Sequence, residues 1–167
     1  EQLTKDSVIV GDMTVTAQWM GSVCHIGEDY YASLEEAAAD AAKSTSGVTI
    51  ELLSNAPLTE TLEITTDVTL DGSAEKFRVS RSKALLMFRV KSGGKLTIKN
   101  VTINGNDMSY SLLYVDGGSA VIAEGAVLTG CSNAVRNETM LDVSGPGTVY
   151  VGEGSLTMTG GSITANH

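Results

Sequence analysis

The sequence predicts an all-β chain: a right-handed, single-stranded parallel β-helix of about four coils, with one short α-helix capping its N-terminal end. Three observations support this fold class. Short aliphatic strands recur with a glycine turn at a fixed offset. The chain has 18 glycines and 2 prolines, and its 42% of hydrophobic residues include only 5% aromatics, so the core is mainly Val, Ile and Leu. A single segment has the pattern of an amphipathic helix.

The repeat consists of three short strands. A Gly-Gly or Gly-x-Gly turn lies between the first and second strands, and the third strand ends in a turn of small residues. The clear copies are 90–98 with 101–105, 115–122 with 126–130, and 151–158 with 161–165; a weaker copy spans 48–52, 62–64 and 68–72. Four copies therefore predict about four coils.

Strands of three to five residues are unstable alone and need neighbours above and below. In a stack of coils, side chains such as Leu96 and Ile98 point into a shared interior, while Thr97 faces solvent. Glycine supplies the backbone dihedrals of the turns. A β-sandwich also has short strands separated by turns and stays an alternative. It does not explain why the glycine turn recurs at a fixed offset from the aliphatic pairs.

The helix is expected at residues 33–43. Ser33 and Glu36 form a capping box, in which Ser33 caps the helix and Glu36 bonds back. The apolar residues Leu34, Ala37, Ala38 and Ala41 share one face. We expect this face to cover the apolar end of the first coil. The alternative is a helix packed against a side of the coils.

Two segments resemble known families. VYVGEGSLTMTGGSITAN (149–166) looks like the repeat of pectate-lyase-like right-handed parallel β-helix regions in bacterial cell-surface proteins, and YYASLEEA (30–37) resembles the entry into such regions. GDMTVTAQW (11–19) is similar to the closing strand of a Listeria–Bacteroides (internalin B-type) repeat, a β-grasp-like module. The resemblances imply three parts: a partial repeat at 1–22, with extended segments at 8–10 and 14–17; an N-terminal cap at 23–47; and β-helix coils at 48–167, truncated at the C-terminus.

The resemblance also implies a location outside the cell, either secreted or in the cell wall. Enzymes of the pectate-lyase-like fold hold calcium on acidic residues, or hydrolyse polysaccharide with paired carboxylates on neighbouring coils. Here Asp71 is expected in a turn, and an insertion separates the coils of Asp116 and Glu153. We therefore predict no catalytic residues. The alternative is the N-terminal part of a polysaccharide lyase or glycoside hydrolase whose active coils follow residue 167.

Composition excludes several classes of function. The net charge of −9 argues against a nucleic-acid partner, and no apolar run reaches the ~18 residues of a membrane span. Cys24 and Cys131 form no CxxC pair, and the chain has two histidines, so no metal site or cofactor is expected. A disulfide between the two cysteines has no support in their spacing.

The bases concentrate in one block. Residues 76–106 hold eight bases and no acid, whereas residues 1–75 hold fourteen acids and two bases. Strand alternation directs Arg89 and Lys91 outward, so a positive band is expected around the second coil. The predicted ligand-binding residues are Arg78, Arg81, Lys83, Arg89 and Lys91. The alternative is a solvated face that balances the acidic N-terminal part.

These features predict a non-catalytic module of adhesin or scaffold type. Its partner would be a host or bacterial surface glycan or protein, bound through the basic band and through corner loops at 73–84, 106–111 and 131–147. The last coil has no cap in the sequence, which also predicts self-association through that end.

Overall fold

The computed structural model describes residues 21–132 and 147–166. The expected strands at 8–10 and 14–17 lie outside the described residues, as do most of the partial repeat at 1–22 and most of the loop at 131–147.

The described residues form short strands and one helix. A hairpin of β1 (Cys24–Ile26) and β2 (Asp29–Tyr31) leads into α1 (Leu34–Ala41). The strands that follow are β3 (Val48–Leu52), β4 (Ala56–Leu58), β5 (Leu62–Ile64), β6 (Asp67–Asp71), β7 (Arg78–Arg81), β8 (Phe88–Lys91), β9 (Lys95–Lys99), β10 (Thr102–Met108), β11 (Leu113–Ile122), β12 (Val127–Cys131), β13 (Val149–Met158) and β14 (Ser162–Ile163).

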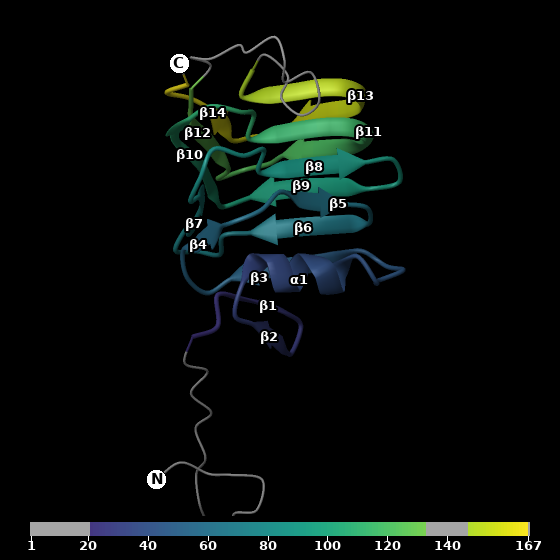
Figure 1. The fold of residues 1–167 in the computed structure, drawn as a ribbon. Helices are drawn as coiled ribbons and strands as arrows, with labels where there is room; N and C mark the ends of the chain where they lie inside the picture. Colours follow the sequence, from purple (N-terminus) through teal and green to yellow (C-terminus); the bar gives the residue numbers. More distant parts are fainter. Residues whose placement is uncertain (1–20, 133–146, 167) are drawn as a thin grey trace, which may run out of the picture.

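These strands form two sheets that face one another across the core (Figure 1). The nine-stranded sheet has the order β2-β1-β3-β6-β9-β11-β8-β5, and β13 adds to it by pairing with β11. The five-stranded sheet has the order β14-β12-β10-β7-β4 and is parallel throughout. From β3 onward the nine-stranded sheet is parallel as well. We call the parallel strands of both sheets the stack.

The prediction of an all-β chain with one helix is confirmed, but the single-stranded parallel β-helix is not what the structure shows. The larger sheet is mixed, because β1 pairs antiparallel with both β2 and β3. The ten-residue β11 also continues through its glycine turn at Gly117 and Gly118, and it pairs with β8 before the turn and with β9 after it. Two expected faces therefore merge into one curled sheet. This topology contradicts the resemblance to pectate-lyase-like β-helix regions.

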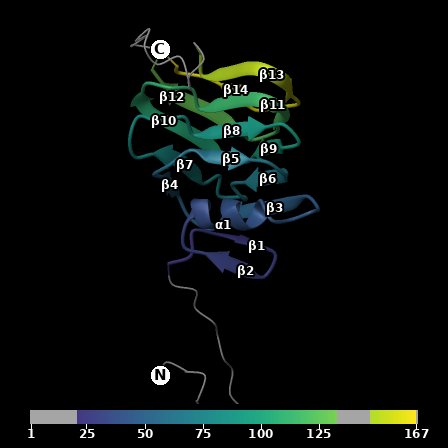
Figure 2. The same ribbon diagram turned by 45° about the vertical axis from the view of Figure 1, so that its right-hand side comes forward.

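The helix α1 begins at a capped end. The Ser33 hydroxyl accepts a hydrogen bond from the Glu36 N–H, and the Glu36 carboxylate accepts one from the N–H of Ala32, one residue before the expected donor. Its buried face is the predicted one, formed by Leu34, Ala37, Ala38 and Ala41. Figure 2 shows α1 and the β1–β2 hairpin together at one end of the stack, with β13 and β14 at the other.

The core runs along the stack as rows of aliphatic side chains. Successive inward positions of neighbouring strands are in register, as in the row Val68, Leu96 and Ala120, all of which are buried. No helix in the described part of the chain is long and apolar enough to cross a membrane. The outward positions of β5, β8, β11 and β13 carry the polar side chains that form the candidate site.

Candidate functional site

One outward row on the larger sheet combines charged and aromatic side chains. The row starts at Glu63 of β5, which is the register partner of Arg89 of β8. On the next strands, Arg89 pairs in register with Tyr114 of β11, and Tyr114 with Tyr150 of β13. Parallel pairing therefore lines up four side chains that are up to 87 positions apart in the sequence. We call this row, together with Lys91 and Asp116, the tyrosine face.

Arg89 is the centre of the charged part of this face. Its guanidinium forms an ion pair with Asp116, with a distance of 2.6 Å from Nη2 to Oδ2 and 2.8 Å from Nε to Oδ2. Both side chains are 29% exposed, so the pair is partly shielded from solvent. The hydrogen bond to Asp116 raises the pKa of Arg89 above its ordinary value. Beside it, Lys91 donates to Glu63 at 2.7 Å.

The aromatic part lies next to this pair. The rings of Tyr114 and Tyr150 have centroids 5.1 Å apart and planes inclined by 31°. The guanidinium of Arg89 lies 5.5 Å from the centroid of Tyr114, within the range of a cation–π contact. The Tyr114 hydroxyl donates to Oδ1 of Asp116 at 3.3 Å. Burial, followed by the nearby Asp116 charge, raises the pKa of Tyr114.

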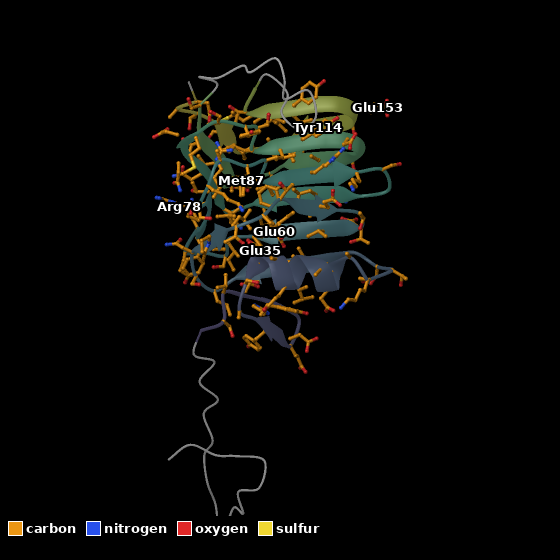
Figure 3. The ribbon with its side chains drawn as sticks, in the orientation of Figure 1. Glu35, Glu60, Arg78, Met87, Tyr114 and Glu153 are labelled. Carbon is orange, nitrogen blue, oxygen red and sulfur yellow. The ribbon has the colours of Figure 1, made fainter. Side chains whose placement is uncertain are left out.

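Asp116 and Glu153 lie on adjacent strands, whereas the sequence predicted that an insertion separates their coils. They are register partners on β11 and β13, so the insertion does not separate their strands. Both oxygens of Asp116 are nevertheless engaged, one by Arg89 and the other by Tyr114. Figure 3 shows Glu153 at the edge of the stack. Asp116 is therefore held as a hydrogen-bond acceptor, an arrangement that suits binding better than proton exchange with a substrate.

The five predicted binding residues do not form one surface. Arg89 and Lys91 meet on the outer face of β8 in the larger sheet, whereas Arg78 belongs to β7 of the smaller sheet. Arg78 and Lys83 are exposed, and neither forms an ion pair with any residue in 21–132 or 147–166. Figure 3 shows Arg78 on the side of the smaller sheet.

Arg81 is not on the surface at all. Its side chain is 0% exposed, and it donates to the carbonyls of Leu85 and Gly105, both at 2.7 Å, of Tyr110 at 2.9 Å, and of Met108. Burial lowers the pKa of Arg81. The surface position expected for this residue is wrong, because its side chain joins the corner after β7 to the corner after β10.

The expected positive band is also largely neutralised. Lys91, Lys95 and Lys99 pair with Glu63, Asp67 and Asp71, at 2.7, 3.2 and 2.8 Å respectively. Burial favours a higher pKa at Asp71, but hydrogen bonds from Lys99, Asn100 and the Ser73 N–H outweigh it and hold the pKa below its ordinary value. The bases of β8 and β9 therefore face the acids of β5 and β6, and no continuous positive surface remains there.

Tyr114 and Tyr150 were missed as site residues. The aligned repeats contain a usable signal, because Arg89, Tyr114 and Tyr150 each directly precede the first valine of a copy. This outward position is charged in one copy and aromatic in the next two. When the copies are stacked, the side chains at this position form a continuous row. Among the described residues, no group of three or more His, Cys, Asp or Glu side chains is arranged to hold a metal ion.

No family, curated protein or solved structure matches this chain. The comparisons therefore support neither the resemblance to pectate-lyase-like regions nor the resemblance to a Listeria–Bacteroides repeat.

Proposed function

We propose that this chain is a non-catalytic binding module that holds a neutral glycan on the tyrosine face. The observation that carries the proposal is the Tyr114–Tyr150 pair beside the Arg89–Asp116 ion pair on the outer face of β8, β11 and β13. Sugar rings have apolar C–H faces that pack on aromatic rings, and their hydroxyls bond to charged groups at the margin. Both requirements meet in this one row.

The charge of the face favours a neutral ligand over an acidic one. Arg89 and Lys91 are balanced by Asp116 and Glu63, and Glu153 adds a further negative charge at the edge. An acidic glycan would have to compete with carboxylates already bound to both bases. The proposed ligand therefore differs from one held by the positive band that the basic block predicted. The regular stack would act as the scaffold, and its expected location outside the cell stays a prediction.

The test is a glycan array followed by calorimetry with the neutral oligosaccharide that binds best. Tyr150→Ala is expected to weaken binding about 2- to 12-fold, the equivalent of 0.5–1.5 kcal/mol for an aromatic contact. Tyr30→Ala is the matched control, because Tyr30 is an exposed tyrosine on β2, at the opposite end of the molecule. Thermal unfolding checks that both variants stay folded.

Three outcomes would overturn the proposal: no neutral glycan bound, equal affinity of Tyr150→Ala and wild type, or an equal loss in Tyr30→Ala. A bound glycan that is cleaved would instead favour a glycoside hydrolase, the alternative suggested by the pairing of Asp116 with Glu153. In that case Glu153→Gln would abolish cleavage while binding persisted.

A further inference from the structure

Among residues 21–132 and 147–166, no further layer covers the inward side chains of β13 and β14. Three inward side chains of this last layer are exposed, whereas their register partners one layer below are fully buried. The exposed residues are Val151 (40%), Met158 (48%) and Ile163 (38%), and the corresponding buried residues are Val115, Ile122 and Leu128, all at 0%. Full burial of each such side chain is worth about 1.5–3 kcal/mol. Another layer with apolar side chains at the same positions would complete the interior.

The opposite end of the stack cannot supply that layer. The helix α1 contacts β3, β4 and β5 there and buries its apolar face, and β1 takes the outer edge of β3 in antiparallel pairing. The edge strand at that end is β2, which has three residues, none of them buried, so it does not repeat the apolar positions of a whole layer. A head-to-tail contact would therefore leave the apolar row of β13 uncovered, whereas a tail-to-tail contact covers it and stops at two copies.

The sequence of β13 suits such a two-fold contact. Its inward residues are Val149, Val151, Leu156 and Met158, which pair in register with the buried Leu113, Val115, Ala120 and Ile122 of β11. These four positions are symmetric about the middle of the strand, between residues 153 and 154. Two antiparallel copies centred there would set Val149 against Met158 of the partner subunit, and Val151 against Leu156 of the partner subunit. Every inward apolar residue would meet another one.

The shape of the strand is compatible with this symmetry. β13 follows β11 around the glycine turn and folds back within the same layer, across the end of the stack (Figure 1). Gly154 sits in that bend with a φ of +100°, and a Cβ there would collide with the Gly118 carbonyl below. A two-fold axis through the bend exchanges the two arms of β13, so each arm lies antiparallel to the opposite arm of the second copy.

We propose that the chain forms a closed, tail-to-tail homodimer in which β13 pairs antiparallel with β13 of a second copy. Among residues 21–132 and 147–166, β13 pairs with β11 alone, so its other edge has backbone donors and acceptors for such a pairing. The dimer joins two stacks end to end and leaves the capped end of each copy outward. It does not depend on glycan binding, because the tyrosine face is on the side of the stack.

The first test is the mass in solution, measured by light scattering coupled to gel filtration across a range of concentrations. Wild type is expected at twice the chain mass of 17.4 kDa, and Val151→Lys at the chain mass, because it places a charge in the apolar contact. Leu53→Lys is the matched control: Leu53 is also 40% exposed but follows β3 at the capped end. A monomeric wild type at high concentration, or a dimer that survives Val151→Lys, would overturn the proposal.

The second test fixes the register. Residue 153 lies beside the proposed axis, so Glu153→Cys brings two thiols within disulfide distance, which requires Cα atoms about 4.4–6.8 Å apart. The native Cys24 and Cys131 are buried and do not compete. Glu75→Cys, an exposed position in the loop before β7, is the control. An oxidised dimer is expected only for Glu153→Cys. A dimer of wild type without this cross-link would overturn the antiparallel pairing.

Discussion

Replacing the buried Arg81 with methionine tests the most unexpected feature of the molecule. The guanidinium donates to the carbonyls of Leu85, Gly105 and Tyr110 at 2.7–2.9 Å, and also to that of Met108. Methionine keeps much of the side-chain volume but has no donor. The substitution therefore removes the hydrogen bonds without opening a large cavity, and it leaves the carbonyls of two corners short of partners.

The expected loss can be worked from these contacts. A hydrogen bond to a charged group contributes about 1.5–3 kcal/mol, so four of them set an upper limit near 6–12 kcal/mol. The desolvation of the buried guanidinium offsets part of that sum, and removing one side of a buried charged network typically costs about 3–5 kcal/mol. We expect the free energy of unfolding to fall by that amount. At about 2–4 °C per kcal/mol for a chain of this size, the melting temperature would drop roughly 6–20 °C.

Urea unfolding followed by circular dichroism measures this change. Arg78→Met is the control, because it makes the same chemical change on the same strand at an exposed position, where a substitution usually shifts stability by about 0.5 kcal/mol or less. Arg81→Lys should lie in between, since an ammonium cannot reproduce the fork of donors. A loss below about 1 kcal/mol in Arg81→Met would refute the idea that this residue joins the corners.

Two further predictions concern titrating groups. Asp71 has a lowered pKa in the folded state, so its contribution is present above its ordinary pKa of 3.8 and is lost as the pH falls through the folded value. Lys99→Met should therefore flatten the loss of stability in acid, while costing about 0–1 kcal/mol at neutral pH; identical acid unfolding curves would contradict this. Burial, reinforced by Glu36 and Glu35, raises the pKa of Cys24 to about 12, so thiol reagents at pH 8 should label the native chain slowly and the urea-unfolded chain rapidly. Rapid labelling of Cys24 in the native chain would contradict its burial.

The position of Arg81 could have been predicted from local alternation. Val79 and Arg81 have the same parity on β7, and the strand follows an exposed–buried–intermediate–buried pattern. An inward Val79 therefore implies an inward Arg81. Arg81 was predicted at the surface because charged residues are usually exposed. Three of the four carbonyls that accept from Arg81, those of Gly105, Met108 and Tyr110, are 24–29 positions away in the sequence, and local alternation does not reveal them.

The prediction of a positive band from the basic block was wrong for a related reason. In sequence, an acidic stretch precedes a basic one, which suggests two surfaces of opposite sign. In the structure, Lys95 and Lys99 are the register partners of Asp67 and Asp71, and Lys91 reaches Glu63 across the same 28-residue spacing. Parallel stacking turns charges separated along the chain into neighbours about one strand spacing apart. The period of the repeat is visible in the sequence, but the register between copies, which pairs the charges, is set by the stacked strands.

The sequence by itself determined the local structure: alternating strands, glycine turns, and a capped helix whose buried face is formed by Leu34, Ala37, Ala38 and Ala41. These depend on residues within one turn or one strand of each other. Only the tertiary structure decided that β11 runs unbroken from β8 to β9, that Arg81 is buried, and that Tyr114 and Tyr150 lie together. Each of these depends on the register between strands far apart in the chain, which is set by packing the whole core at once.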